Sequence, residues 1–189
     1  ISDKTLVDSE KNKDFLINKK LAYWGRAIAR RNLNNISDAI LDYKIVLEIE
    51  PKNVSTLEIL GDLNQELGNY NEALEYFNKL IELESNNAYY LSKRAYQKGL
   101  LNNDKGAIDD LNKAINIDPN NSINFLNRGI AESNLGNLKN AIFNYKKSLD
   151  IDPDNKIVYE SLCKANYFLK EYEESIKYCI DSINLNNNK

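Results

Sequence analysis

Pairs of acidic residues are the side chains in this sequence whose spacing could support catalysis. Three such pairs occur: Asp109 with Asp110, Glu173 with Glu174, and Glu58 with Asp62. A hydrolytic pair needs one acid whose pKa is raised inside an enclosed cleft. The rest of the sequence predicts an open array of paired helices, which offers little enclosure. We therefore expect the protein to have no enzymatic activity.

The composition excludes several other kinds of site. The 189 residues contain no histidine, which removes Ser-His-Asp and Cys-His triads and the commonest general base. Two cysteines are too few for a four-cysteine metal cluster. The seven glycines form neither of the common nucleotide-binding motifs, and no acidic run has the spacing of a calcium loop. The sequence therefore predicts no metal and no cofactor.

Charge and hydropathy narrow the choice of partners. The chain has 25 Lys and Arg residues against 28 Asp and Glu residues, a formal charge of −3. This sign disfavours a nucleic-acid partner, whose phosphates attract basic surfaces. No apolar run approaches the roughly 18 residues that a transmembrane helix needs. We expect neither nucleic-acid binding nor a transmembrane segment.

A period of about 34 residues organises most of the chain. Similar short segments recur at 48–53, 82–87, 116–121 and 150–155. Two columns of small residues recur at the same interval: Ala27, Gly61, Ala95, Gly129 and Cys163, and then Ala39, Ala73, Ala107, Ala141 and Ser175. Small side chains allow two helices to approach closely. The period therefore indicates that one structural unit is repeated.

Each unit has the pattern of two amphipathic helices, because its apolar residues stand three and four positions apart. In the fourth unit the helices are expected at 122–135 and 139–152, with a turn at Gly136-Asn137. Pro153 ends the second helix, since proline has no N–H to donate. Neither helix can bury its apolar stripe alone, so each unit must stack on the next. The sequence predicts an all-α fold, an α-solenoid of antiparallel helix pairs.

These columns resemble the tetratricopeptide repeat (TPR) family. The second unit fits best through Leu57, Leu60, Gly61, Leu67, Gly68, Tyr70, Ala73 and Phe77. The resemblance implies a TPR domain over 18–189, a right-handed superhelix with repeats at about 20–53, 54–87, 88–121, 122–155 and 156–189. The first repeat departs from the family at Arg26 and Arg30, where apolar residues are usual. The fifth departs at Cys163, Ser175, Cys179 and Ser182.

Residues 1–17 do not continue the period, and we interpret them as a polar leader. We expect this leader to be helical from Asp14 onward, with Phe15 and Leu16 capping the first repeat. The chain begins at Ile1 without methionine, which suggests removal from a longer protein. It finishes at Lys189, where a further repeat or a capping helix would begin.

The two cysteines lie in columns on the paired helices of the fifth repeat, at similar height. One interpretation is a pair of buried, reduced thiols that fill space, which is typical of the cytoplasm. The other is a disulfide between Cys163 and Cys179, which would imply an oxidising compartment. The cytoplasm is favoured, and a periplasmic or envelope-associated location stays open.

In TPR proteins the first helices of the repeats line a concave groove that holds a segment of a partner. Transferred column by column, the expected groove residues are Trp24, Ile28, Glu58, Asp62, Tyr89, Lys93, Tyr96, Leu126, Asn127 and Ile130. The aromatic and aliphatic residues Trp24, Tyr89, Tyr96, Leu126 and Ile130 are expected to be partly exposed, as binding surfaces often are. The alternative is that the leader or a second copy of the chain covers them.

Glu58, Asp62 and Glu66 stand four apart on one expected helix and form an acidic stripe. The stripe would favour a partner with Lys or Arg, unless Lys93 or Arg31 neutralises it. A subset of TPR proteins holds the acidic C-termini of chaperones through a clamp of Lys, Asn and Arg residues. Every frame of that clamp keeps at most one suitable residue here, such as Lys93 or Asn127. We therefore expect no carboxylate clamp.

The sequence predicts a protein-interaction scaffold or adaptor that binds a peptide or helix of another protein in the groove. The partner segment is expected to be apolar with basic residues. Self-association through the terminal repeat is a further expectation. The alternative is an accessory subunit of a bacterial envelope assembly or secretion system, which a signal peptide or lipoprotein cysteine upstream of Ile1 would favour.

Overall fold

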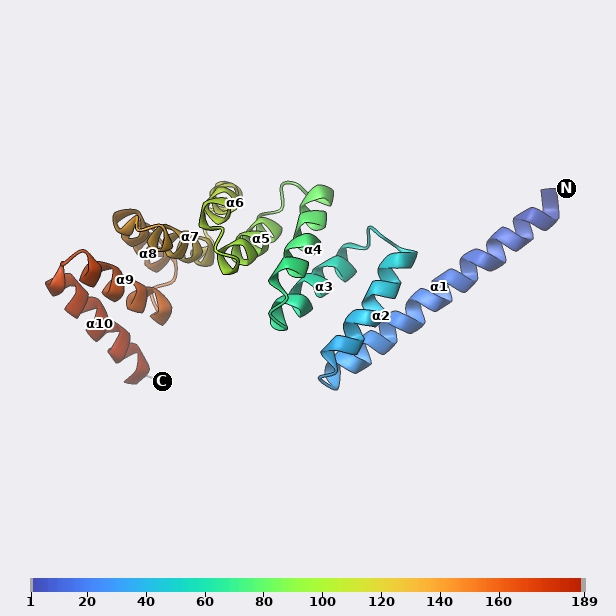
Figure 1. Cartoon of the computed structure of the whole chain (residues 1–189), viewed down its shortest axis with the longest axis horizontal. Coiled ribbons are helices and arrows are strands. Elements are labelled where there is room, and N and C mark those ends of the chain that lie inside the picture. The colour runs from blue at the N-terminus through green and yellow to red at the C-terminus, as the bar shows by residue number, and fades with distance from the viewer. Residues whose placement is uncertain (1, 188–189) are drawn as a thin grey trace. The chain divides into compact units, whose positions relative to one another are not determined.

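The computed structural model describes the backbone of residues 2–187 and the side chains of residues 12–185. Within that range the fold is all-α and of the α-solenoid type, with helix pairs packed in series inside each of two compact units (Figure 1). The helices are α1 (Ser2–Asn32), α2 (Ile36–Ile49), α3 (Val54–Glu66), α4 (Tyr70–Leu83), α5 (Ala88–Leu100), α6 (Asp104–Ile117), α7 (Ser122–Asn134), α8 (Leu138–Ile151), α9 (Lys156–Phe168) and α10 (Tyr172–Asn187). The chain forms two compact units, residues 1–83 and residues 84–189.

Asparagine side chains begin many of these helices. The oxygen of Asn53 accepts a hydrogen bond from the backbone N–H of Thr56 at 2.9 Å. Asn87 and Asn121 stand one and two periods further on and cap α5 and α7 in a similar way. Such caps satisfy backbone N–H groups that have no partner within the helix. The asparagine that closes the first three recurrent segments therefore caps the first helix of the next repeat, whereas Asn155 occupies the same position without a side-chain cap.

The turn inside each helix pair has the same backbone conformation in all five repeats. A positive φ occurs at one position of the period: Asn34, Gly68, Asn102, Gly136 and Lys170. Glycine adopts this conformation without steric cost, and asparagine tolerates it better than most residues. The two residues therefore suit this position, and Lys170 is the exception.

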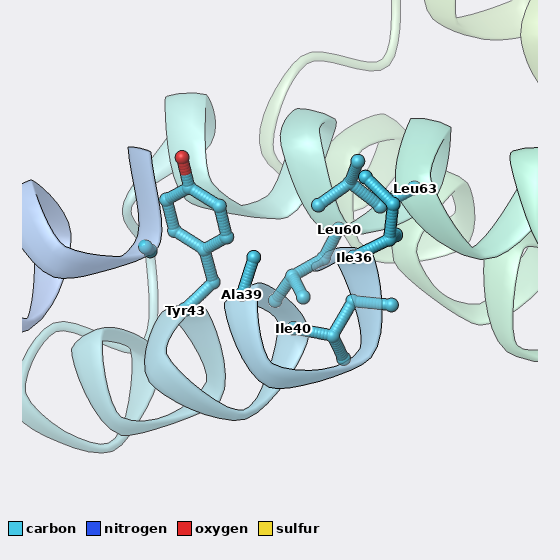
Figure 2. Close-up of a cluster of buried hydrophobic side chains, with 7 residues drawn as sticks. Ile36, Ala39, Ile40, Tyr43, Leu60 and Leu63 are labelled. Atoms are coloured by element: carbon cyan, nitrogen blue, oxygen red, sulfur yellow. The ribbon is translucent and has the colours of Figure 1, made fainter. Parts of the chain in front are cut away.

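Close packing of the paired helices depends on the small columns. In unit 1, Ala27 and Ala39 are fully buried in a cluster with Tyr43 and with side chains of α3 (Figure 2). In α3, a Cβ at Gly61 would lie 2.8 Å from Cζ of Phe77. In unit 2, a Cβ at Gly129 would lie 2.5 Å from the ring of Tyr145. Each large ring thus occupies the space that a small residue leaves opposite it.

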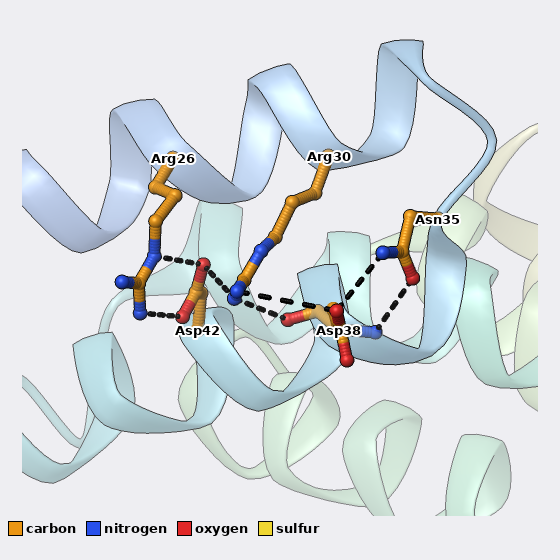
Figure 3. A network of polar contacts seen from close by, with 5 residues as sticks. All are labelled: Arg26, Arg30, Asn35, Asp38 and Asp42. Carbon is orange, nitrogen blue, oxygen red and sulfur yellow. Dashed lines mark hydrogen bonds and ion pairs between the residues drawn. The ribbon is translucent and has the colours of Figure 1, made fainter.

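Arg26 and Arg30, which depart from the TPR pattern, form ion pairs with the second helix of their repeat. Both contact the buried carboxylate of Asp42 in α2, each at 2.6 Å (Figure 3). The hydrogen bond from Arg26 is the main cause that holds the pKa of Asp42 below its usual range. Arg30 also donates to the backbone oxygen of Asp38. The departures therefore couple α1 to α2.

The same polar contact recurs two repeats later, between Arg94 of α5 and Asp110 of α6 at 2.6 Å. Lys98 also contacts Asp110, at 2.7 Å. In the fourth repeat Arg128 donates to Asn144 at 2.7 Å. The second and fifth repeats instead have leucine and tyrosine at these two columns: Leu60 with Tyr76 and Leu162 with Tyr178. The two columns thus change together, and the chain contains a polar and an apolar version of one packing position.

The leader differs from its expected form. Helix α1 begins at Ser2 and runs unbroken to Asn32, so the predicted start at Asp14 was wrong. Phe15 is 63% exposed and Leu16 is 39% exposed, so neither seals the first repeat. Lys20 ties α1 to the end of α2 through an ion pair with Glu50 at 2.8 Å. The leader boundary at residue 17 stays a prediction, because the helix passes through it without interruption.

Cys163 of α9 and Cys179 of α10 form a disulfide in the structure, with their Cα atoms 5.2 Å apart. Both side chains are half-buried, which differs from the expectation of buried, reduced thiols. Ser175, one turn before Cys179, is buried and donates from Oγ to the backbone oxygen of Cys163 at 2.9 Å. The disulfide and this hydrogen bond therefore link the last two helices, and Cys179 stands where the other repeats have a larger residue: Tyr43, Phe77, Leu111 and Tyr145.

We expect the purified protein to contain no free thiol. Titration under denaturing conditions without reductant measures this directly, since all cysteines are then accessible. The same titration after reduction should give two thiols per chain and serves as the control. Two thiols per chain before reduction would contradict the disulfide and would restore the interpretation as reduced cysteines.

Candidate functional site

The expected groove residues of unit 1 lie on α1 and α3. Trp24 is half-buried and contacts Tyr43 edge to face, with ring centroids 5.3 Å apart. Its exposed side borders a pocket of about 220 Å³ that is also lined by Lys20, Leu21, Asn53 and Ser55. Trp24 therefore belongs partly to the core, and Ile28, 42% exposed, is the more accessible of the two apolar groove residues on α1.

The acidic stripe lies on α3. Glu66 is exposed, whereas Glu58 and Asp62 are half-buried. Both half-buried carboxylates interact with other residues. The three acids thus stand four residues apart on α3, and Glu58 and Asp62 interact with other residues of the chain.

The first helices of unit 2 carry exposed apolar residues at equivalent positions. Tyr89, Ile123 and Ile157 occupy one column on α5, α7 and α9 and are 46%, 58% and 57% exposed. Tyr96 and Ile130 stand seven positions after the first two and are also exposed. A spacing of seven places residues on the same helix face, and α7 packs against both α5 and α9. We call these five residues the unit 2 apolar surface.

Leu126 does not belong to this surface. It is only 7% exposed and packs in a buried cluster with Tyr145 of α8 and Val158 of α9. The expectation that it would be partly exposed was wrong, because α8 and α9 close over it. Lys93 lies on α5 with its Nζ 5.4 Å from the ring centroid of Tyr89. The lysine therefore sits at the edge of the unit 2 apolar surface.

A pocket of about 200 Å³ opens between α5, α6 and α7. It brings together Tyr96, Asn127 and Ile130, three of the expected groove residues. Ala95, Ala107, Leu111 and Ala131, all buried, also line it. The small side chains of these alanines leave the space open, so the small columns that allow helices to approach also form a hollow beside the exposed surface.

Asp104, the first residue of α6, also lines this pocket and was missed by the sequence argument. Its side chain is 8% exposed, and Oδ1 accepts a hydrogen bond from Nδ2 of Asn134 at 2.9 Å. The equivalent positions in the other repeats hold apolar residues: Ile36, Tyr70, Leu138 and Tyr172. A single acid in an apolar column is the signal that could have identified it.

Two of the three carboxylate pairs considered for catalysis, Asp109 with Asp110 and Glu173 with Glu174, have unsuitable environments. Burial raises the pKa of Asp110, but hydrogen bonds from Arg94 and Lys98 outweigh burial and hold it below the usual range. An acid catalyst needs the opposite shift. Asp109, Glu173 and Glu174 are exposed. Within the described residues, no group of three or more metal-ligating side chains is found, and none of the helices has the length and hydropathy to cross a membrane.

Comparison with known proteins supports the repeat architecture. Residues 54–87 and 124–155 match the tetratricopeptide repeat family. The chain is similar to a crystal structure of MamA, with 25% identity, a TM-score of 0.82, and coverage of 90% of this chain and 93% of that one. It is also similar to MamA from Desulfovibrio magneticus RS-1 (18% identity, TM-score 0.84, 90% and 97% covered). A third similar structure is YrrB, described as a TPR protein with an unusual peptide-binding site (18%, 0.73, 92% and 91%). No curated protein matches the chain.

Proposed function

We propose that the chain, whose residues 54–87 and 124–155 match the tetratricopeptide repeat family and whose helices pack in pairs, is a non-catalytic scaffold or adaptor of that family. It binds a peptide or helical segment of a partner protein on the first helices of its repeats. Proteins of this fold commonly serve in protein interactions, and function resides in the surface residues that each one presents. The proposal therefore rests on the surface of this chain.

The unit 2 apolar surface is the observation that carries the proposal. Exposed apolar residues that cluster on one face mark interaction sites more often than scattered ones do. Tyr89 and Tyr96 add rings that can anchor a partner with little loss of side-chain freedom. The peptide-binding site named for YrrB is a property of that protein, and its similarity to this chain supports the fold alone.

The partner segment is expected to carry apolar anchors and at least one lysine or arginine. Apolar contacts would supply most of the affinity, whereas acidic residues such as Glu58 and Asp62 would raise the rate of association with a basic segment through long-range attraction. An acidic chaperone tail is disfavoured, because the positions of a carboxylate clamp hold Tyr89, Ile123 and Asp62 in place of basic or amide residues. The net charge of −3 agrees with a basic partner.

Replacing Tyr96 and Ile130 together by alanine should weaken capture of the native partner by about 1,000-fold, because central interface residues each contribute about 2 kcal/mol or more. Both side chains are exposed, so the double variant should keep its fold. A pull-down from cells of the source organism identifies proteins retained by wild type and lost with the variant. Titration of such a protein then gives the affinity change.

Phe143→Ala is the matched control, since Phe143 of α8 is 58% exposed and lies on a second helix of its repeat. This variant should retain the partner as wild type does. Equal capture by Tyr96→Ala/Ile130→Ala and wild type would exclude the unit 2 apolar surface as the binding site. An equal loss of partner capture by Phe143→Ala would indicate that the partner binds the second helices of the repeats.

Self-association through the terminal repeat is a second proposed role. Tyr172, Ile176, Ile180 and Ile183 form an exposed apolar face along α10. One repeat earlier, Ile142 and Leu149 of α8 pack on the buried cluster that α8 shares with α9. The face of α10 therefore repeats a stacking surface seen within the chain, and a second copy is the occupant that would extend this stacking.

The oligomeric state tests this role. Wild type should sediment as a dimer or larger species whose population rises with concentration, and Ile176→Lys/Ile180→Lys should remain monomeric. Lysine at an exposed apolar interface residue costs the apolar contact and introduces repulsion between like charges. Phe143→Lys provides the control for charge alone. A monomeric wild type at about 0.1 mM would contradict self-association of functional strength.

An accessory role in a bacterial envelope assembly or secretion system is the alternative function. Fractionation of source cells distinguishes it from the leading proposal. Recovery with the envelope fraction, together with a partner from that compartment, would support the alternative. Recovery in the cytoplasm would exclude it and would agree with the favoured location.

A further inference from the structure

The pocket between α5, α6 and α7 combines an apolar wall with one buried charge. Asp104 is the only charged side chain in its lining. Its carboxylate accepts one hydrogen bond, from Asn134, and has no ion pair within the described residues. Charged groups are rarely buried without an oppositely charged partner, because removal from water is costly. The pocket therefore contains a buried negative charge whose side-chain partner within the described residues is the neutral amide of Asn134.

Asp104 also explains why the pocket is open. The residues at its position in the other repeats are larger and apolar, as Ile36 and Leu138 illustrate. Ile36 is 9% exposed and packs in the core of unit 1. A shorter acidic side chain at the same position leaves volume unfilled and adds a negative charge to it. Asp104 thus contributes both to the open volume of the cavity and to its polarity.

The mouth of the pocket has the character of a site for a long side chain. Tyr96 is 43% exposed there and Ile130 is 39% exposed, so the opening lies on the unit 2 apolar surface. An aromatic ring beside a carboxylate favours a cation, since the ring face attracts positive charge. The alanines of the pocket wall suit the methylene stem that precedes such a cation.

We propose that this pocket receives a lysine or arginine side chain of the bound partner, with Asp104 pairing its charge. This inference rests on the proposed function, because it assigns one feature of the partner segment to one place on the surface. Apolar residues of the partner would cover Tyr89 and Ile123 while the basic side chain enters between α5 and α7. The ion pair would select partners with a basic residue at that register.

Small cations test the pocket without an identified partner. n-Butylguanidinium and n-butylammonium mimic the two side chains, and n-butanol is the uncharged control. Their binding to the full chain is followed by NMR through the side-chain amide resonances of Asn127 and Asn134, which line the pocket. Both cations should give saturable shifts at these amides, whereas n-butanol should bind at least about tenfold more weakly.

Asp104→Asn removes the charge and keeps an oxygen that can accept from Asn134. It should weaken cation binding at least about tenfold, the effect of losing a charge-assisted contact. Asp109→Asn, an equal charge change at an exposed position of the same helix, should bind cations as wild type does. Equal melting temperatures of the two variants show that the fold is kept.

Absence of saturable shifts in wild type would overturn the proposal, and so would equal cation binding by Asp104→Asn. Equal binding of n-butanol and the cations would also overturn it, since it would show an apolar pocket alone. These outcomes leave the proposed function intact if Tyr96→Ala/Ile130→Ala still loses the native partner. Conversely, the proposed function would fail and the pocket proposal would stand if wild type bound the cations but Tyr96→Ala/Ile130→Ala still captured the native partner.

Discussion

Replacing Phe77 by alanine is expected to lower the free energy of unfolding by about 3–5 kcal/mol, the usual cost of removing a buried aromatic ring. Phe77 is fully buried in α4 and packs against Gly61 of α3. Its removal leaves a cavity where the two helices of the second repeat approach most closely. Chemical denaturation followed by circular dichroism measures the change, and loss of less than about 1 kcal/mol would contradict this packing.

The fit between Phe77 and Gly61 can be tested with residues that the chain itself uses elsewhere. Gly61→Ala brings a Cβ to 2.8 Å from the ring and should cost about 1–3 kcal/mol through overpacking. The third repeat has the complementary pair Ala95 and Leu111 at these columns. Adding Phe77→Leu to Gly61→Ala should therefore recover much of the lost stability. Strictly additive effects would show that the two residues do not share the space.

The repeat period allowed accurate prediction of the helices. The fourth repeat was expected at 122–135 and 139–152, and its helices are Ser122–Asn134 and Leu138–Ile151. The signals involved are local: an asparagine cap, a turn residue with positive φ, and a proline after the last turn. Because each signal occurs several times at one interval, the period separates it from chance.

The start of α1 could not be predicted in this way. Residues 1–17 lie outside the period, so no other repeat supplies a template for them. Phe15 and Leu16 suggested a cap because apolar residues are usually buried. Both are instead exposed on α1, which extends on the N-terminal side of the first repeat. Residue type alone therefore gave the wrong environment where no periodicity constrained it.

The candidate site was predicted less completely than the fold. Tyr96, Asn127 and Ile130 were expected to share a surface and do line one pocket. Leu126 was placed on that surface because its column holds Trp24 and Glu58, but Val158 and Leu162 of the next repeat cover it. The position of a residue in the period determines the helix and the helix face on which it lies. Whether its side chain is buried depends on how the neighbouring repeat packs against that face.

The polar packing position could not be recognised from one column of the period alone. Arg26 and Arg30 appeared as departures from the family, although each contacts an acid in a second column. Comparing the two columns across repeats would have revealed arginine with aspartate or asparagine, and leucine with tyrosine. Such paired changes within one chain identify contacts without any alignment of relatives.

Replacing Asp110 by alanine is the other change with a large expected effect, a loss of about 3 kcal/mol at neutral pH, the lower end for a broken buried ion pair. The Asp110 side chain is 2% exposed, and those of Arg94 and Lys98 are each 18% exposed. The two cations would stay partly buried without their acid. Denaturation of wild type and variant at pH 7 measures the difference.

The effect should depend on pH in a defined direction. The folded-state pKa of Asp110 is lowered from 3.8, so its carboxylate stabilises the fold above that pH. This stabilisation is lost as the pH falls through the lowered folded-state value, and the gap between wild type and Asp110→Ala should narrow below about pH 4. Asp109→Ala, at the neighbouring exposed position, should cost less than about 0.5 kcal/mol at either pH.

The second and fifth repeats supply the compensating change. They have leucine, asparagine and tyrosine where the third has Arg94, Lys98 and Asp110. In both, the asparagine donates to the backbone oxygen four positions earlier at 2.7 Å. Arg94→Leu/Lys98→Asn/Asp110→Tyr should therefore restore stability to within about 1 kcal/mol of wild type, since apolar replacement of a buried ion pair is often neutral. It should also abolish the part of the loss of stability at low pH that comes from protonation of Asp110. A triple variant as unstable as Asp110→Ala would show that the ion pair is specific to its own repeat.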